Sequence, residues 1–259
     1  MIKFFRKIRL NLLSEGKTGK YFKYAVGEIV LVVIGILIAL QINTWNQKKK
    51  NQKLEQQYYC RLLEDVEQDY INYNNSIDLL NEKINTNNTL IQKLLDNKMP
   101  LDSISPYIIK SIKYSIRNVS ATTDAFEDIK SSGNLNIIKD FSVKNKLTSY
   151  YESLGNTNSI IESNGKAITE KRFFESEDLL SSGWIQFLED FNEIDTSKVS
   201  LKLLKSKVKF TNEARLRMTN DAIFYLAINS RNKQLLKLLE NEILSTKSLL
   251  EEKCQNQKD

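Results

Sequence analysis

The sequence predicts an all-α protein in which an N-terminal amphipathic helix and one transmembrane helix are followed by an elongated antiparallel helical bundle with two long bracketing helices. Three observations support this fold class. The 259 residues include only two prolines and eight glycines. A strongly apolar run lies near the N-terminus, and the rest of the chain repeats apolar residues at steps of three and four, the spacing of one helix face. We therefore divide the chain into residues 1–20, 21–45 and 46–259.

Residues 1–20, "MIKFFRKIRLNLLSEGKTGK", are predicted to form a basic amphipathic segment beside the membrane. Phe5, Ile8 and Leu12 share one helical face, and Arg6 belongs to the basic residues that cover the rest. Such helices lie in the headgroup layer and are held there by anionic lipid. A targeting peptide or a nucleic-acid-binding arm would have a similar composition, but the adjoining apolar run favours the membrane interface.

Residues 21–45, "YFKYAVGEIVLVVIGILIALQINTW", are predicted to span a membrane as one uncleaved helix. At about 1.5 Å per residue the segment covers roughly 36 Å, enough to cross a hydrocarbon layer of about 30 Å with some tilt. Tyr21 and Tyr24 at one end and Trp45 at the other are expected at the two membrane–water interfaces. A cleaved signal peptide is disfavoured because the leader is long and no small-residue cleavage site follows the apolar run.

Glu28 is the unusual residue of this span, since a carboxylate within a bilayer is costly. In one interpretation it reaches the headgroups or pairs with Lys20 or Lys23. In the other it belongs to a helix-packing face that it shares with Gly35 and Ala39. Small residues four positions apart let two membrane helices approach closely, so the second interpretation predicts an oligomer seam.

The distribution of charge explains why the chain is basic. Residues 1–45 carry 7 basic and 2 acidic groups, and the remainder carries 31 and 30, so most of the net charge of +6 belongs to the anchor. The sequence therefore predicts no nucleic-acid partner. A small excess of basic residues before the span predicts a cytoplasmic N-terminus and a domain outside the cytoplasm.

Two motifs carry a resemblance to a known family. The opening "MIKFFRKIRLNLLSEGKTGKYFKYAVGEIVLVVIGILIALQINTWN" and the segment "SSGNLNIIKDFSVKNKLTSYY" at residues 131–151 resemble a family of uncharacterised single-pass membrane proteins common in Bacteroidota. The two motifs cover about a quarter of the chain. The resemblance implies a protein of the bacterial inner membrane, and it implies no activity. Together with the predicted orientation, an inner-membrane location makes the domain periplasmic.

The domain begins with a predicted long helix, because residues 47–99 contain neither glycine nor proline. Apolar residues step by four and three along it in a heptad seam. The seam consists of Tyr59, Leu63, Val66, Tyr70, Tyr73, Ile77, Leu80, Ile84, Asn87, Ile91 and Leu94. We interpret Asn87, the one polar member, as a residue that fixes helix register rather than a ligand.

Shorter helices are predicted after a turn at Pro100 and Pro106, over residues 108–116 and 122–130, with Gly133 ending the second. Asp140 is the expected N-cap of a helix that Gly155 closes, and a further helix follows over residues 157–180. The last long helix is expected from about residue 201 to residue 254. Its apolar side is formed by Met218, Ala222, Tyr225, Leu236, Leu239, Ile243 and Leu250.

The residue types argue against catalysis, a bound cofactor or a metal site. The chain contains no histidine, which removes the usual general base and the common nucleophile pairs and zinc sites. No glycine-rich phosphate loop is present. Neighbouring carboxylates such as Glu64 with Asp65 and Glu127 with Asp128 are expected to be solvated on polar helix faces.

Two classes of function remain. We expect a structural or scaffolding role in the cell envelope, exerted through a protein partner or a homo-oligomer. The alternative is an extracytoplasmic sensor that binds a ligand and signals through a partner, although only about twenty residues precede the span, too few for an output domain. A cavity lined by aromatic residues such as Tyr107, Tyr114, Phe126 and Trp184 would favour the sensor.

Cys60 and Cys254 are the only cysteines, and we expect them to remain unbridged. If the last helix starts near residue 201, the two cysteines differ in height by about 16 residues, or roughly 24 Å. A disulfide usually requires Cα atoms about 4.4–6.8 Å apart. A kink or a shorter final helix would close part of the difference.

Overall fold

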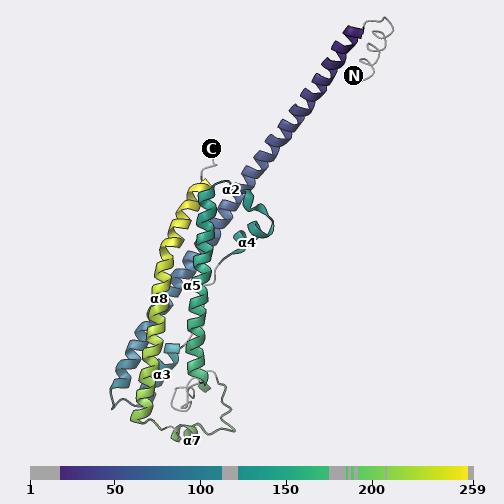
Figure 1. The fold of residues 1–259 in the computed structure, drawn as a ribbon. Coiled ribbons are helices and arrows are strands. Elements are labelled where there is room, and N and C mark those ends of the chain that lie inside the picture. The colour runs from purple at the N-terminus through teal and green to yellow at the C-terminus, as the bar shows by residue number, and fades with distance from the viewer. Residues whose placement is uncertain are drawn as a thin grey trace. The chain divides into compact units, whose positions relative to one another are not determined.

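The computed structural model describes residues 18–112, 122–174, 185, 188–189, 192–207 and 209–255 (Figure 1). Every regular element within them is a helix, which confirms the all-α fold class. The elements are α2 (Thr18–Leu95), α3 (Leu101–Ile112), α4 (Asp124–Ser131), the 3₁₀ helix η1 (Asn134–Asn136), α5 (Phe141–Phe174), α7 (Leu201–Ser206) and α8 (Asn212–Gln255). The chain divides into two compact units, Met1–Gln57 and Tyr58–Asp259.

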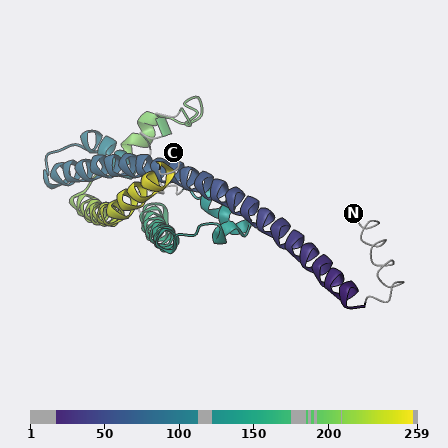
Figure 2. The same ribbon diagram turned by 90° about the horizontal axis from the view of Figure 1, so that it is seen from above.

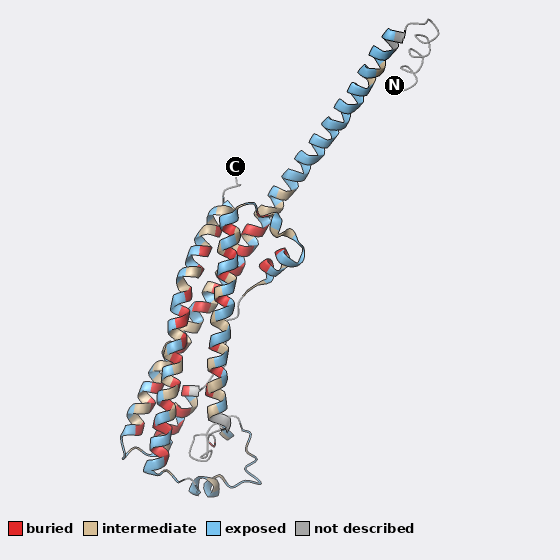
Figure 3. Cartoon of the chain, viewed as in Figure 1, coloured by how far each residue is buried: buried red, intermediate tan, exposed pale blue. Residues whose placement is uncertain are grey.

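The first unit contains the apolar part of α2, which is helical throughout. Its described side chains from residue 22 to residue 50 are all exposed, apart from the half-buried Ala25 and Glu28 (Figure 3). By length and composition, this helix is able to cross a membrane. Residues 1–17 of the predicted interfacial segment, which include Phe5 and Arg6, lie outside the described residues.

Among its described residues, the second unit contains three long helices, one more than expected. They are the part of α2 from Tyr58 onward, α5 and α8, which lie side by side (Figures 1 and 2). Lys146 of α5 pairs with Glu242 of α8 at 2.6 Å, and the Asn164 amide of α5 donates to Asn232 of α8 at 2.6 Å. These pairs show that α5 and α8 run antiparallel.

In α2 the buried face is rotated from the predicted heptad seam. Every seventh residue of the prediction is buried: Tyr59, Val66, Tyr73, Leu80, Asn87 and Leu94. The other predicted members are only half-buried: Leu63, Tyr70, Ile77, Ile84 and Ile91. A second buried row takes their place, formed by Leu62, Asp69, Lys83 and Leu90. Two members of this row, Asp69 and Lys83, are charged. The apolar residues alone therefore predicted a buried face that is rotated by one position from the observed one.

The predicted apolar side of α8 is confirmed, since all seven of its residues are buried. Polar residues complete the same face at steps of three and four, namely Arg215, Asn229, Asn232 and Thr246. The helix begins at Asn212 rather than near residue 201, because residues 201–206 form the separate helix α7.

Two expected breaks in the helices are wrong. Gly155 lies inside α5, which continues to Phe174, and its buried stripe runs from Val143 through Leu154 to Ile168. A helix-interior glycine costs about 1 kcal/mol relative to alanine, less than the stripe stabilises. Pro106 lies inside α3, whose Ile104 and Ile108 pack in a core cluster with residues of α2 and α8. The expected turn is therefore limited to Pro100.

Two predicted helix ends are confirmed. Gly133 follows α4 with a φ of 71°, the left-handed conformation that glycine adopts most easily. The Asp140 carboxylate accepts hydrogen bonds from the backbone N–H and the hydroxyl of Ser142, at 2.9 and 2.6 Å, just before α5 begins. Lys253 and Ser142 hold the pKa of Asp140 well below its ordinary value of 3.8. Asp140 therefore links the start of α5 to the end of α8.

The prediction of unbridged cysteines is wrong, because Cys60 and Cys254 form a disulfide with Cα atoms 5.0 Å apart. The late start of α8 explains the error. At the far end of the pair, Arg215 donates to the carbonyls of Leu94 at 3.3 Å and Asp96 at 2.9 Å. Along α2, Cys60 is nearly as many residues from this contact as Cys254 is along α8. The two cysteines therefore lie at the same height along the helix pair.

We expect the disulfide to be present in the purified full-length protein. Maleimide should label neither Cys60 nor Cys254 until a reductant is added, and labelling without reductant would contradict the bond. Reduction should lower the free energy of unfolding by about 2–5 kcal/mol, because the bond closes a loop between residues 194 apart. Denaturant titration measures this loss, and a Cys60→Ser, Cys254→Ser variant, insensitive to reductant, is the control.

Candidate functional site

The residues predicted to act in the membrane lie on the exposed part of α2. Tyr24, Ala39 and Trp45 are exposed, and Lys49 lies 4.1 Å from the centre of the Trp45 ring. Gly35 has no neighbouring atoms that a Cβ would meet within 4 Å. Tyr21 belongs to α2, but its side chain is outside the described set. The oligomer seam of Glu28, Gly35 and Ala39 therefore stays a prediction.

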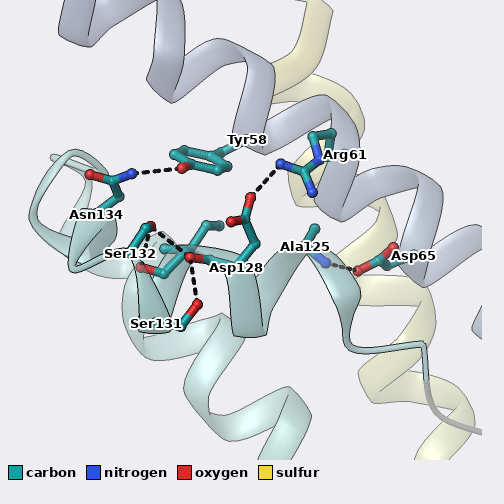
Figure 4. Close-up of polar contacts among 9 residues, drawn as sticks. Tyr58, Arg61, Asp65, Ala125, Asp128, Ser131, Ser132 and Asn134 are labelled. Carbon is teal, nitrogen blue, oxygen red and sulfur yellow. Dashed lines mark hydrogen bonds and ion pairs between the residues drawn. The ribbon is translucent and has the colours of Figure 1, made fainter.

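The second unit contains a group of polar contacts where α4 and η1 meet α2 (Figure 4). Arg61 of α2 forms an ion pair with Asp128 of α4 at 2.6 Å. The Asn134 amide of η1 donates a hydrogen bond to the Tyr58 hydroxyl of α2 at 2.8 Å. The two contacts attach α4 and η1 to the same face of α2.

Two buried carboxylates of α2 hold the N-terminal end of α4. The Asp65 carboxylate accepts from the Ala125 N–H at 2.8 Å, and Asp69 accepts from the Thr122 N–H at 2.7 Å. A helix N-terminus has unpaired N–H groups and a positive dipole end, and both favour a carboxylate. Thr123, the N-cap of α4, makes no capping hydrogen bond with its own side chain. Asp65 thus takes over the role of a cap from a neighbouring helix, and Asp69 holds the residue that precedes the N-cap.

The same carboxylates connect α2 to α5. The Tyr150 hydroxyl donates to Asp69 at 2.6 Å, and both residues are fully buried. Tyr151 is next to it, and its buried hydroxyl has no hydrogen-bond partner among the described residues. We call Asp65, Asp69, Tyr150 and the N-terminal end of α4 the carboxylate clamp.

Burial dominates the electrostatics of the clamp. It raises the pKa of Asp65 and of Asp69, against the hydrogen bonds from Ala125, Tyr150 and Thr122, which lower them. Burial and the nearby carboxylates also raise the pKa of Tyr150 and Tyr151 far above the ordinary tyrosine value. Each of these acids therefore holds its proton more tightly than it would in water.

A pocket lies beside the clamp, between α4, η1 and α5. Its volume is about 470 Å³. Phe126, Leu135, Tyr151 and Leu154 form its apolar lining, with the Phe126 and Tyr151 rings stacked at a centroid distance of 4.2 Å. Its polar lining comes from Thr123, Glu127, Lys130, Thr148 and Glu152, and Gly155 completes it.

Of the aromatic residues expected in a cavity, the structure places only Phe126 in this pocket. Tyr107 packs instead against the core cluster of α2, α3 and α8. Tyr114 and Trp184 lie outside the described residues. No group of three or more His, Cys, Asp or Glu side chains is arranged to hold a metal ion in the part of the chain that the structure describes.

The sequence interpretation missed the clamp. Asp65 was expected on a solvated face with Glu64, but it is buried whereas Glu64 is exposed. One signal was available. Asp69 lies seven residues after Leu62 and three after Val66, within the period of the buried face. A carboxylate at such a position indicates a hydrogen-bonded structural role, because a buried charge needs donors.

A protein-family model matches part of the chain. The model of a family of unknown function, DUF6090, matches residues 28–177, which is more than half of the chain. The matched range contains most of the apolar segment, the carboxylate clamp and the lining of the pocket, but not α8. No curated protein matches, and no solved structure does.

Asp69→Ala should lower the free energy of unfolding by about 2–4 kcal/mol, since it leaves the Thr122 N–H and the Tyr150 hydroxyl without their acceptor. Denaturant titration of the full-length protein measures the loss. Glu64→Ala, at an exposed position of the same helix, is the control and should change stability by less than about 0.5 kcal/mol. Equal effects of the two variants would show that the clamp is not stabilising.

Asp69→Asn tests the raised pKa of the same residue. The folded chain keeps a proton on Asp69 at pH values where the unfolded chain, with a pKa of 3.8, has lost it. The stability of the wild type relative to Asp69→Asn should therefore fall as the pH rises from about 4 through the folded-state pKa. A difference that grows over this range would mean that the pKa is lowered instead.

Proposed function

The chain belongs to a family of unknown function, DUF6090, and from its own residues we propose that it is a membrane-anchored helical protein with a structural or scaffolding role in the cell envelope. In this proposal the helix over residues 21–45 crosses the inner membrane once. The domain of residues 46–259 extends into the periplasm and acts by binding another protein or a second copy. The proposal assigns no reaction to the chain.

The observation that carries the proposal is the uncovered apolar surface of α2. Large apolar side chains such as Val30, Ile34 and Leu37 are about half exposed, and the described part of the chain covers none of them. Exposing so large an apolar surface to water is unfavourable at about 25 cal/mol per Å². A bilayer removes this cost, and the helix satisfies its own backbone hydrogen bonds, as a bilayer requires.

The disulfide supports the proposed compartment. Disulfides persist in oxidising compartments such as the bacterial periplasm and are rare in the cytosol. The bond between Cys60 and Cys254 therefore favours a domain outside the cytoplasm. The excess of basic residues ahead of the span favours the same orientation, with residues 1–20 against anionic headgroups.

The contacts between the helices support a scaffold. The disulfide, the Arg215 contacts and the carboxylate clamp join α2 to α8, α4 and α5 at separate points. Such cross-connections resist sliding of one helix along another. The part of the chain after residue 45 carries almost equal numbers of basic and acidic groups, so it suits a protein partner better than a polyanion.

The anchor can be tested by membrane extraction. The wild-type protein should remain in the membrane pellet at alkaline pH, enter solution only with detergent, and retain its N-terminal peptides. Ile34→Lys with Leu37→Lys should move it toward the soluble fraction, because each lysine costs about 2.5–3.5 kcal/mol at the centre of a span. Ile71→Lys, at an exposed position of the second unit, is the control. Release of the wild type without detergent, or a mature N-terminus after Ala39, would refute the anchor.

A further inference from the structure

The pocket between α4 and α5 has the size and lining of a small-molecule site. Its volume of about 470 Å³ lies within the range of roughly 300–1,000 Å³ that such sites occupy. The rings of Phe126 and Tyr151, which stack on each other, provide an aromatic wall, to which Leu135 and Leu154 add aliphatic surface. Phe126 and Leu154 are buried, so this wall is part of the folded core rather than a loose surface feature.

Gly155 lines the same pocket and adds no side chain to it. It lies well inside α5, where glycine weakens a helix relative to any other residue except proline. Close packing often explains a helix-interior glycine, but a Cβ at this position would meet no atom within 4 Å. Its backbone needs no positive φ, because it is part of a regular helix. A larger side chain at position 155 would instead occupy the space of the pocket.

The charged lining residues indicate the charge of the ligand. Lys130 is paired with Glu127 at 3.2 Å and lies 5.5 Å from the centre of the Phe126 ring. Glu152 has no ion pair with any described residue. The lining therefore carries one carboxylate more than it can neutralise, which attracts a cation and repels an anion.

We propose that this pocket binds a small organic cation with a flat apolar body, such as an aryl-alkyl amine. The body packs against the wall formed by Phe126 and Tyr151, and the ammonium group lies toward Glu152. Offset or edge-to-face contact with the two rings favours an aromatic body. This assignment adds a ligand to the proposed anchoring role and does not depend on it.

The test uses two fluorinated probes with the same body and opposite charge. They are 4-fluorophenethylamine and 3-(4-fluorophenyl)propionate, titrated onto the full-length protein in nanodiscs of zwitterionic lipid and followed by ¹⁹F NMR. We expect saturable binding of the amine, at least about fivefold tighter than binding of the acid. No saturable binding of the amine, or equal binding of the two probes, would overturn the proposal.

Three variants locate the binding. Gly155→Leu should weaken binding of the amine at least about tenfold by filling the pocket, whereas Gly155→Ala should bind as the wild type does. Glu152→Gln, at an exposed position, should weaken the amine severalfold and leave the acid no weaker. Thermal unfolding confirms that each variant is folded. Amine binding unchanged by both Gly155→Leu and Glu152→Gln would place the probe elsewhere and refute the site.

Discussion

The register between α2 and α8 is the constraint on which the rest of the second unit depends. The disulfide between Cys60 and Cys254 sets it at one end, and Arg215 sets it at the other by binding carbonyls in the last turn of α2 and just after it. Between them, Lys247 of α8 pairs with Glu67 of α2 at 3.2 Å. Sliding α8 by one turn would break all three contacts together, so the buried faces have one way to meet.

With that register set, α5 fits against both helices and completes the clamp. Tyr150 reaches Asp69 on α2, and Asn164 reaches Asn232 on α8, so α5 runs parallel to α2 and antiparallel to α8. Asp65 then lies where it can cap α4. With α4 held in this position, the pocket lies between α4 and α5. The polar contacts and the pocket are therefore consequences of how three helices are aligned, rather than features of one segment.

Local patterns predicted what depends on local structure. The apolar face of α8, the left-handed Gly133 and the Asp140 cap were all visible in the sequence, because each follows from residues close together along the chain. The predicted helix end at Gly155 was wrong, because a glycine destabilises a helix by less than the burial of the apolar stripe on both sides of it stabilises α5. The disulfide and the clamp depend on which residues of different helices come level. Because the start of α8 was predicted at the wrong residue, the sequence did not predict the disulfide.

Cross-linking in native membranes tests the central claim most directly. Intact membranes are treated with a lysine-reactive cross-linker, and the linked peptides are identified by mass spectrometry. The account predicts links from exposed lysines of the domain, such as Lys130 and Lys198, to another envelope protein or to a second copy, the latter recognised by mixed isotope labels. If every link joins residues of one chain, the proposed scaffolding role is contradicted.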